Sequence, residues 1–196
     1  MSVAAAVLAA GRGVRFGGEQ PKALLQLRGR ALIAYALEAA LASGCAPVVA
    51  VVSDESVADA ATDAVVLRNA DPARGIASSL HCALTYLEPE ASVTAVVVGL
   101  ADQPAVGAEA YRRVAASEAP LAVATYGGRR ANPVRIDRAM WPAAMQLAGD
   151  TGARALFERF GVVEVPCDGT GDPADVDTPA DLAALESRWR SPTASE

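Results

Sequence analysis

Short apolar runs alternate with longer alanine- and leucine-rich stretches along most of the chain. Runs of strand length predict strands at Val3–Leu8, Pro47–Val52, Val65–Leu67, Thr94–Leu100, Leu121–Thr125 and Val162–Val165. The longer stretches predict helices at Ala31–Ser43, Ser78–Leu87, Glu109–Ser117, Ala139–Leu147, Ala153–Phe160 and Pro179–Trp189. Strands that are apolar throughout are typical of a parallel sheet covered on both faces.

This alternation of strands and helices predicts an α/β fold with a mostly parallel central sheet. A chain of 196 residues suits one domain, which we expect over residues 1–190, with residues 191–196 as a disordered tail. The segment Tyr126–Asn132, with its adjacent glycines, predicts a loop. In sheets of this kind ligands bind beyond the carboxyl ends of the strands, so the functional site is expected there.

Composition narrows the class of protein. Hydrophobic residues make up 52% and aromatic residues 5%, so Ala, Val and Leu must build the core. The net charge of −6 argues against a nucleic-acid partner. Cys45, Cys82 and Cys167 have neither zinc-ligand spacing nor the density of a disulfide scaffold. No basic residue precedes Val3–Ala10 as in a signal peptide, and no run approaches the ~20 residues of a membrane span, so we expect a cytoplasmic protein.

The glycine-rich segment after the first predicted strand carries the most informative chemistry. Glycines let the backbone approach a ligand, and consecutive N–H groups in such a turn can form an anion nest. Arg12, Arg15 and Lys22 add positive charge and directional hydrogen bonds in an otherwise acidic chain. The segment therefore predicts a polyphosphate site, and the alternative is a structural turn with solvated basic residues.

Two familiar phosphate-binding patterns fit this segment poorly. A Walker A loop needs Gly-Lys-Ser/Thr, whereas Lys22 stands between Pro21 and Ala23. A dinucleotide fingerprint needs a third glycine where Phe16 stands, and the acid expected ~20 residues further on is missing. An NAD-binding Rossmann oxidoreductase is therefore the less favoured alternative.

Aspartates follow the later elements. Asp102 comes directly after a predicted buried strand, where a carboxylate can present an oxygen to Mg²⁺ or cap the following turn. In the run from Asp175 to Pro179, an Asp or Thr before Pro makes a good helix start, with Asp177 or Thr178 as the cap. Capping alone does not require both Asp175 and Asp177, and which of them would meet a metal stays open.

These motifs together resemble a known family. Leu8-Ala9-Ala10-Gly11-Arg12-Gly13-Val14-Arg15-Phe16, followed by Pro21-Lys22, is similar to the signature of nucleotidyltransferases that activate sugars, alditols and pterins with an NTP. Ala101-Asp102-Gln103-Pro104, Asn132-Pro133-Val134, Gly149-Asp150-Thr151-Gly152-Ala153-Arg154 and Asp175-Val176-Asp177-Thr178-Pro179 resemble the molybdenum cofactor cytidylyltransferase branch of MobA-like NTP transferases. The motifs occur in the expected order over nearly the whole chain.

The resemblance implies a Rossmann-like three-layer sandwich of the nucleotide-diphospho-sugar transferase type. It implies an enzyme that uses Mg²⁺ to transfer CMP or another NMP from an NTP to a small phosphorylated acceptor, with release of pyrophosphate. The implied nucleotide-binding residues are Leu8, Ala9, Ala10, Gly11, Arg12, Gly13, Lys22 and Ser79. The implied catalytic residues are Arg15, Lys22 and Asp102, the metal ligands Asp102 and Asp177, and the acceptor-side residues Asn132, Pro133, Gly149 and Asp150. Ala9-Ala10, in place of a glycine pair, implies CTP.

The acceptor is left open by one departure from the branch. The segment from Arg15 to Lys22 is one residue longer than molybdenum cofactor enzymes have, and its Pro-Lys ending resembles methylerythritol phosphate cytidylyltransferases. Those enzymes carry an Asp-x-Ala-Arg element where this chain has Asp102-Gln103-Pro104. An inactive nucleotide-binding relative is a further alternative.

Other polar residues have weaker assignments. A phosphate acceptor is already ionised and needs no catalytic base, so the single histidine, His81, is expected to have no role in the chemistry. Arg129 and Arg130 either contact an anionic acceptor or are solvated loop charges.

Overall fold

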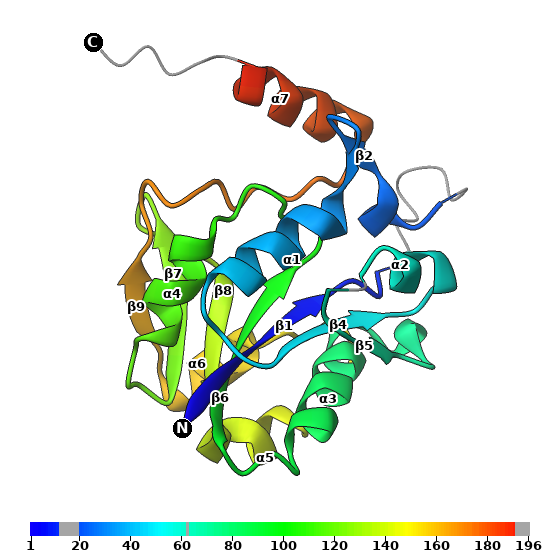
Figure 1. Ribbon diagram of the computed structural model, residues 1–196. Helices are drawn as coiled ribbons and strands as arrows, with labels where there is room; N and C mark the ends of the chain where they lie inside the picture. The colour runs from blue at the N-terminus through cyan, green and yellow to red at the C-terminus, as the bar shows by residue number, and fades with distance from the viewer. Residues whose placement is uncertain (12–19, 62, 191–196) are drawn as a thin grey trace.

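A mixed seven-stranded sheet forms the centre of the molecule (Figure 1). The computed structural model describes residues 1–11, 20–61 and 63–190. The strands are β1 (Ser2–Leu8), β4 (Val48–Val52), β5 (Val65–Arg68), β6 (Val93–Leu100), β7 (Leu121–Tyr126), β8 (Arg129–Asp137) and β9 (Val163–Pro166). Their order is β5-β4-β1-β6-β8-β7-β9, and only the two pairs that involve β8 are antiparallel. The prediction of a mostly parallel sheet is confirmed.

Helices cover both faces of this sheet. The helices α1 (Leu32–Ala42) and α4 (Ala108–Ala115) pack on one face, and α3 (Ile76–Leu87), α5 (Trp141–Ala144) and α6 (Arg154–Phe160) on the other (Figure 1). The remaining elements are the short hairpin β2 (Gln26–Leu27) and β3 (Arg30–Ala31), α2 (Glu55–Asp59), α7 (Pro179–Arg190) and the 3-10 helices η2 (Lys22–Leu24), η3 (Pro72–Arg74) and η4 (Arg138–Met140). The three-layer α/β sandwich is thereby confirmed.

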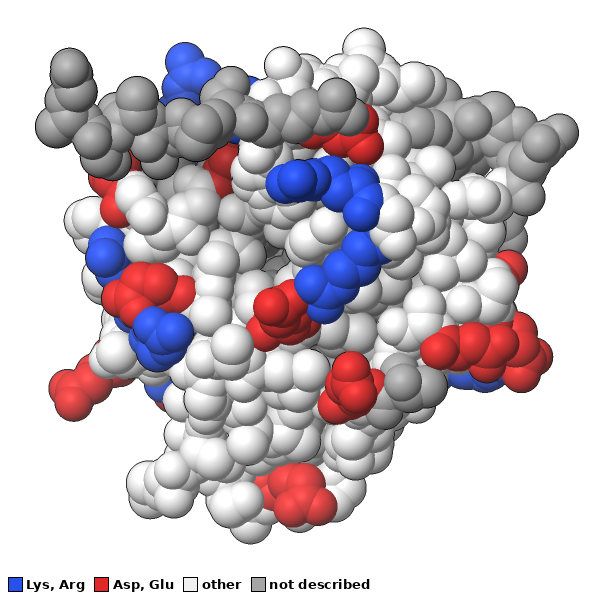
Figure 2. Space-filling model, turned by 45° about the horizontal axis from the view of Figure 1, so that its top comes forward, with Lys and Arg blue, Asp and Glu red and all other residues white. Residues whose placement is uncertain are grey.

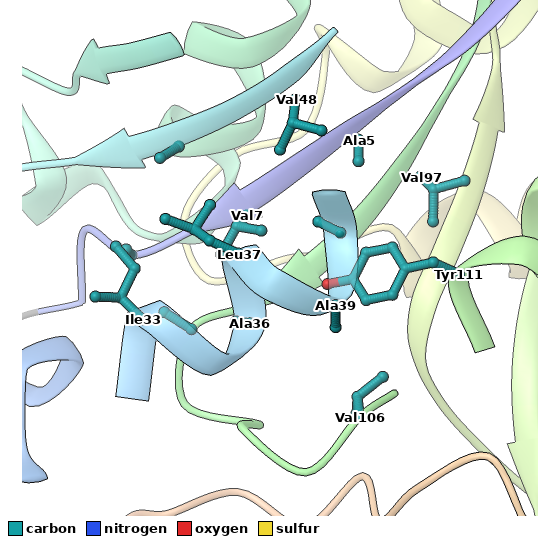
Figure 3. Close-up of a cluster of buried hydrophobic side chains, with 14 of the residues drawn as sticks. Ala5, Val7, Ile33, Ala36, Leu37, Ala39, Val48, Val97, Val106 and Tyr111 are labelled. Carbon is teal, nitrogen blue, oxygen red and sulfur yellow. The ribbon is translucent and has the colours of Figure 1, made fainter. Parts of the chain in front are cut away.

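The core consists of small aliphatic side chains, as the composition predicts. Residues 4–7 of β1 and 49–52 of β4 are fully buried, because both strands are covered by helices on each face. Figure 3 shows one of the two large clusters, in which Val7, Ile33 and Leu37 pack together and Tyr111 reaches in from α4. This close packing fixes the carboxyl ends of the strands.

Gly99 on β6 is one of the positions where the packing depends on glycine. A Cβ atom placed there would lie 1.8 Å from the hydroxyl oxygen of Tyr111, a side chain that is 2% exposed. We expect Gly99→Ala to lower the free energy of unfolding by about 1–3 kcal/mol, because overpacking displaces a rigid ring in a close-packed core. Denaturant unfolding measures this change.

The control for Gly99→Ala is Tyr111→Phe, alone and combined with it. Removing the hydroxyl takes away the nearest atom, so the double variant should recover part of the loss. Equal stabilities of the wild type and Gly99→Ala would contradict the packing described here.

The loop predicted at Tyr126–Asn132 is wrong for most of its length. Gly127 and Gly128, with φ angles of 57° and 75°, form a two-residue hairpin turn, and β8 begins directly after them. Positive φ at both central residues is the requirement of a type I′ turn, which glycine meets easily. The apolar pattern that would predict this strand is interrupted by Arg129, Arg130 and Asn132.

The helix predicted at Ala139–Leu147 is also wrong in extent. A single 3-10 turn, η4, leads into α5, which has only four residues. The other predicted strands and helices are confirmed with shifts of up to two residues at their ends.

Charged side chains of both signs and free thiols are distributed over the described part of the chain. On the face shown in Figure 2, basic and acidic side chains are interspersed among large uncharged areas. Cys45 and Cys167 are buried, Cys82 is partly buried, and all three are free thiols. Within the described ranges, no helix has the length and apolar character needed to cross a membrane.

Candidate active site

The carboxyl ends of the parallel strands bring distant segments together at one edge of the sheet. The backbone N–H of Ala9 donates to the Val51 carbonyl oxygen at 2.8 Å, and that of Ala101 donates to the Leu8 carbonyl oxygen at 3.1 Å. The segment after β1 therefore lies beside the segment after β6, which carries Asp102. This is the edge at which ligands bind in open α/β sheets.

Lys22 lies between two carboxylates at this edge. Its Nζ donates to Asp102 Oδ2 at 2.7 Å and to Asp177 Oδ1 at 2.5 Å. The Lys22 side chain is 11% exposed, whereas those of Asp102 and Asp177 are 28% and 42% exposed. One cation and two carboxylates from three distant segments thus form a single polar cluster, which we call the Lys22 cluster.

Local hydrogen bonds explain why Asp177 rather than Asp175 joins the Lys22 cluster. The N–H of Val176 donates to the Asp102 carbonyl oxygen at 2.9 Å, which holds the segment before α7 against the end of β6. Thr178 and Asp181 exchange hydrogen bonds as a capping box at the start of α7. The helix start therefore uses Thr178 and Asp181, and the Asp177 carboxylate is directed at Lys22.

Gln103 holds Asp175 in a different network. Its Nε2 donates to Asp175 Oδ1 and to the Pro173 carbonyl oxygen, each at 3.0 Å. Its Oε1 accepts from Asn132 Nδ2 at 3.1 Å. Because Gln103 is 6% exposed, this buried amide connects the segment before α7 with β8.

The surroundings of the Lys22 cluster shift the pKa of Lys22 and that of the neighbouring Asp175. Burial by itself lowers the pKa of Lys22, but hydrogen bonds and the charges of Asp102 and Asp177 outweigh it and raise the pKa above its ordinary value. Loss of water around the Asp175 carboxyl group and the nearby charge of Asp102 raise the pKa of Asp175, although the hydrogen bond from Gln103 opposes this. Because its pKa is raised, the Lys22 side chain stays a cation at neutral pH.

The same carboxylates fit a divalent cation. Asp102 Oδ1 is buried, and no hydrogen-bond partner for it lies in the described part of the chain. No group of three or more His, Cys, Asp or Glu side chains in the described ranges could hold a metal. Mg²⁺ is commonly held by one or two carboxylates and completed by phosphates and water. Asp102 and Asp177 are two carboxylates close enough to share the Lys22 ammonium group, and such a pair matches this donor requirement.

A cavity of about 530 Å³ opens beside the Lys22 cluster, and we call it the first cavity. Its lining combines backbone from the segment after β1 with the start of α3 and the polar cluster. The lining residues are Leu8, Ala10, Gly11, Lys22, Pro72, Ala73, Gly75, Ile76, Ser79, Leu100, Asp102, Asp150 and Asp177. This volume lies within the range of small-molecule sites.

A second cavity of about 420 Å³ lies next to the first. The two share Leu8, Ile76, Leu100 and Asp150 in their linings, so they adjoin along these residues. The second cavity is mostly apolar and is bounded by β6, β7, β8 and α6. Its polar side chains include Asn132, Asp150 and the arginines Arg130 and Arg154.

Gly75 allows the turn at Gly149 to approach the start of α3. Its φ angle is 82°, and a Cβ atom there would lie 2.3 Å from the Gly149 carbonyl carbon. The N–H of Ala77 donates to the Gly149 carbonyl oxygen at 3.2 Å. The turn at Gly149 is thereby packed against the start of α3, and it places Asp150 between the cavities.

Most of the sequence-predicted site residues meet at these cavities. The first cavity is lined by Leu8, Ala10, Gly11, Lys22, Ser79, Asp102, Asp150 and Asp177, and the second by Leu8, Asn132 and Asp150. Ala9 and Pro133 are buried and line neither, and Gly149 lines a smaller hollow that also contains His81. Arg12, Gly13 and Arg15 lie outside the described residues. Arg130 pairs with Glu164 at 2.7 Å, and Arg129 is exposed.

Sequence reasoning missed two polar residues that organise the site, Asn69 and Gln103. Asn69 directly follows β5 at the same edge of the sheet, and it is 8% exposed. Its position after the short predicted strand Val65–Leu67 is the sequence signal that places it at this edge. Gln103 belongs to the motif Ala101-Asp102-Gln103-Pro104, but no local pattern indicates its three partners, Pro173, Asp175 and Asn132.

The architecture is that of an open α/β sheet with a polar cluster and two adjoining cavities at its carboxyl edge. A model of the MobA-like NTP transferase domain matches residues 5–165, and the chain belongs to this family. A solved structure of Rv0371c from Mycobacterium tuberculosis H37Rv is 29% identical, with a TM-score of 0.82, and covers 95% of this chain and 98% of that one. Another, of Rv0371c in complex with manganese, is 27% identical, with a TM-score of 0.76 and coverages of 95% and 99%.

One relative with a similar sequence is named as an oxidoreductase rather than as a transferase. Nicotine blue oxidoreductase from Paenarthrobacter nicotinovorans is 33% identical over 197 residues, or 90% of this chain and 92% of that protein. The family nevertheless makes this chain a nucleotidyltransferase enzyme.

Proposed function

We propose that this nucleotidyltransferase uses Mg²⁺ to transfer CMP from CTP to a small phosphorylated acceptor, releasing pyrophosphate. The observation that supports the proposal most is the Lys22 cluster, which brings one cation and two carboxylates together beside a cavity of nucleotide size. The small residues Ala9 and Ala10 after β1 favour cytidine within the family resemblance.

Each member of the cluster has a role in this proposal. Asp102 and Asp177 would hold the metal, which would supply neutralisation of the phosphate charge. Lys22 exchanges its carboxylate partners for phosphate oxygens when the nucleotide binds, and it stabilises the charge on the leaving pyrophosphate. Arg15, which lies outside the described residues, is proposed to contact the triphosphate.

The transfer itself requires positioning more than covalent help from the protein. An oxygen of the acceptor phosphate forms a bond to the α-phosphorus while the bond from that phosphorus to the pyrophosphate oxygen breaks. Because the acceptor phosphate is already ionised, no side chain has to remove a proton. His81 agrees with this, since its ring Nε2 lies 3.2 Å from the Ala144 carbonyl oxygen and the residue lines neither the first nor the second cavity.

We place the acceptor in the second cavity. The two cavities adjoin at Asp150, so a molecule in the second can present a phosphate to a nucleotide in the first. Asn132 and Asp150 offer hydrogen bonds to an acceptor whose remaining surface is covered by apolar side chains. A molybdenum cofactor precursor is the acceptor that the motifs favour, and methylerythritol phosphate is the alternative.

A second candidate activity comes from the named oxidoreductase relative. An oxidoreductase of the NAD-binding Rossmann type would transfer electrons from a nicotinamide cofactor without Mg²⁺ and without pyrophosphate release. The glycine-rich segment after β1 argues against an NAD-binding enzyme, because the third glycine of the dinucleotide fingerprint is missing.

One assay separates these candidates. The protein is incubated with Mg²⁺, each of the four NTPs and an acceptor panel that includes molybdopterin species and methylerythritol phosphate, and pyrophosphate is followed. We expect release with CTP and one phosphorylated acceptor, and none after chelation of the metal. Oxidation of NADH with no pyrophosphate from any pair would contradict the proposal.

A further inference from the structure

The Asn69 side chain is locked in one orientation beside the first cavity. Its Oδ1 accepts from the N–H of Asp71 at 3.0 Å, so its Nδ2 must face the other way. Nδ2 donates to Ser78 Oγ at 2.8 Å and to Ser79 Oγ at 3.0 Å. Both Asn69 and Ser79 are buried, at 8% and 5% exposure, so these bonds are shielded from water.

The two serines use their own protons differently. Ser78 Oγ donates to the Gly75 carbonyl oxygen at 2.8 Å. Ser79 Oγ accepts from Asn69, and within residues 1–11, 20–61 and 63–190 it donates no hydrogen bond of its own. Ser79 lines the first cavity. Its hydroxyl group is therefore held as a hydrogen-bond donor toward whatever occupies that cavity.

We propose that Asn69 is a positioning residue that sets base selectivity by holding Ser79 as a donor to the nucleotide base. This inference rests on the proposed function, in which the first cavity binds an NTP. A fixed donor needs an acceptor on the base, and the ring nitrogen of the base-pairing edge is an acceptor in cytosine but carries a proton in uracil. A buried site built around one hydrogen bond discriminates against a ligand that leaves the donor unpaired.

The variant Asn69→Asp inverts this arrangement with almost no change in shape. The new carboxylate still accepts from Asp71, but it can no longer donate to Ser79. Ser79 then donates its proton to residue 69 and presents lone pairs to the cavity. We expect the ratio of the UTP to the CTP dissociation constant to fall by about tenfold, the size of one hydrogen bond.

The binding experiment uses the whole protein, with CTP and UTP titrated separately in the presence of Mg²⁺. The added negative charge weakens both nucleotides, so the ratio is the quantity that reports base selectivity. Ser79→Ala and Asn69→Ala should also lower the ratio, because the first removes the donor and the second releases it. Ser78→Ala is the matched control and should leave the ratio unchanged. The Ser78 hydroxyl also accepts a hydrogen bond from Asn69, but it donates its own proton to the Gly75 carbonyl oxygen.

The outcomes are distinguishable. Wild-type protein that binds CTP more tightly than UTP, with a lower ratio in Asn69→Asp and Ser79→Ala, supports the inference. An unchanged ratio in Ser79→Ala, or in a folded Asn69→Asp, overturns it while leaving the nucleotide site intact. Wild-type protein that binds neither nucleotide contradicts the proposed function itself. A thermal melt of each variant shows whether it is folded.

Discussion

Replacing Asp102 by Asn is expected to lower Mg²⁺-dependent pyrophosphate release by a factor of about 10³ or more. The substitution keeps the size of the side chain but removes one of the two carboxylates proposed to hold the metal. Loss of a single preorganised electrostatic group in an active site commonly reduces turnover by ~10²–10³, and a metal ligand also affects the occupancy of the metal. Steady-state pyrophosphate release measures the effect.

Asp175→Asn is the matched control for Asp102→Asn. Asp175 lies on the same segment as Asp177 and carries the same charge, but it accepts from Gln103 instead of pairing with Lys22. We expect this variant to keep most of its activity and Asp102→Asn to keep a folded core. Wild-type turnover in Asp102→Asn, or equal losses in the two variants, would contradict the assignment of the metal to Asp102 and Asp177.

The second large effect is expected for Lys22. Lys22→Ala should lower turnover by about 10²–10³. Among the described residues of the Lys22 cluster, Lys22 alone has a positive charge that can stabilise the triphosphate. Its effect on metal binding has the opposite sign. Removing the ammonium group takes a competing cation away from Asp102 and Asp177, so the nucleotide-free protein should bind Mn²⁺ at least as tightly as the wild type.

Lys22→Met is the control for Lys22→Ala, since it keeps an apolar stem in the same place. A charge role predicts equal losses of turnover in both variants, and a packing role predicts that Met restores activity. Turnover is measured together with Mn²⁺ affinity by electron paramagnetic resonance. Weaker Mn²⁺ binding in both folded variants would show that Lys22 does not compete with the metal.

The strands and helices with a clear apolar pattern could be predicted from the sequence. The run of Ala and Val in β1 has only one stable environment, a strand covered on both faces. Its position before a glycine-rich segment predicts a site at the carboxyl edge of the sheet, where Lys22 and Asp102 meet in the structure. Asp102 was predicted for the same reason, because a carboxylate at the end of a buried strand must face that edge.

Other features depend on contacts that no local pattern contains. The polar residues Arg129, Arg130 and Asn132 predict a loop where β8 lies, yet pairing with β6 and β7 on both sides stabilises a strand there. The choice between Asp175 and Asp177 required the capping box of Thr178 and Asp181 and the partner that Gln103 gives to Asp175. The role of Asn69 could not be seen before its partners on α3 were known.

Calorimetric titration of the wild-type protein with CTP, with and without Mg²⁺, tests the central claim most directly because it needs no acceptor. We expect saturable binding of one CTP per chain that depends on the divalent metal and is lost in Asp102→Asn. Binding of equal strength without metal, or unchanged binding in Asp102→Asn, would contradict a metal-dependent nucleotide site at the Lys22 cluster.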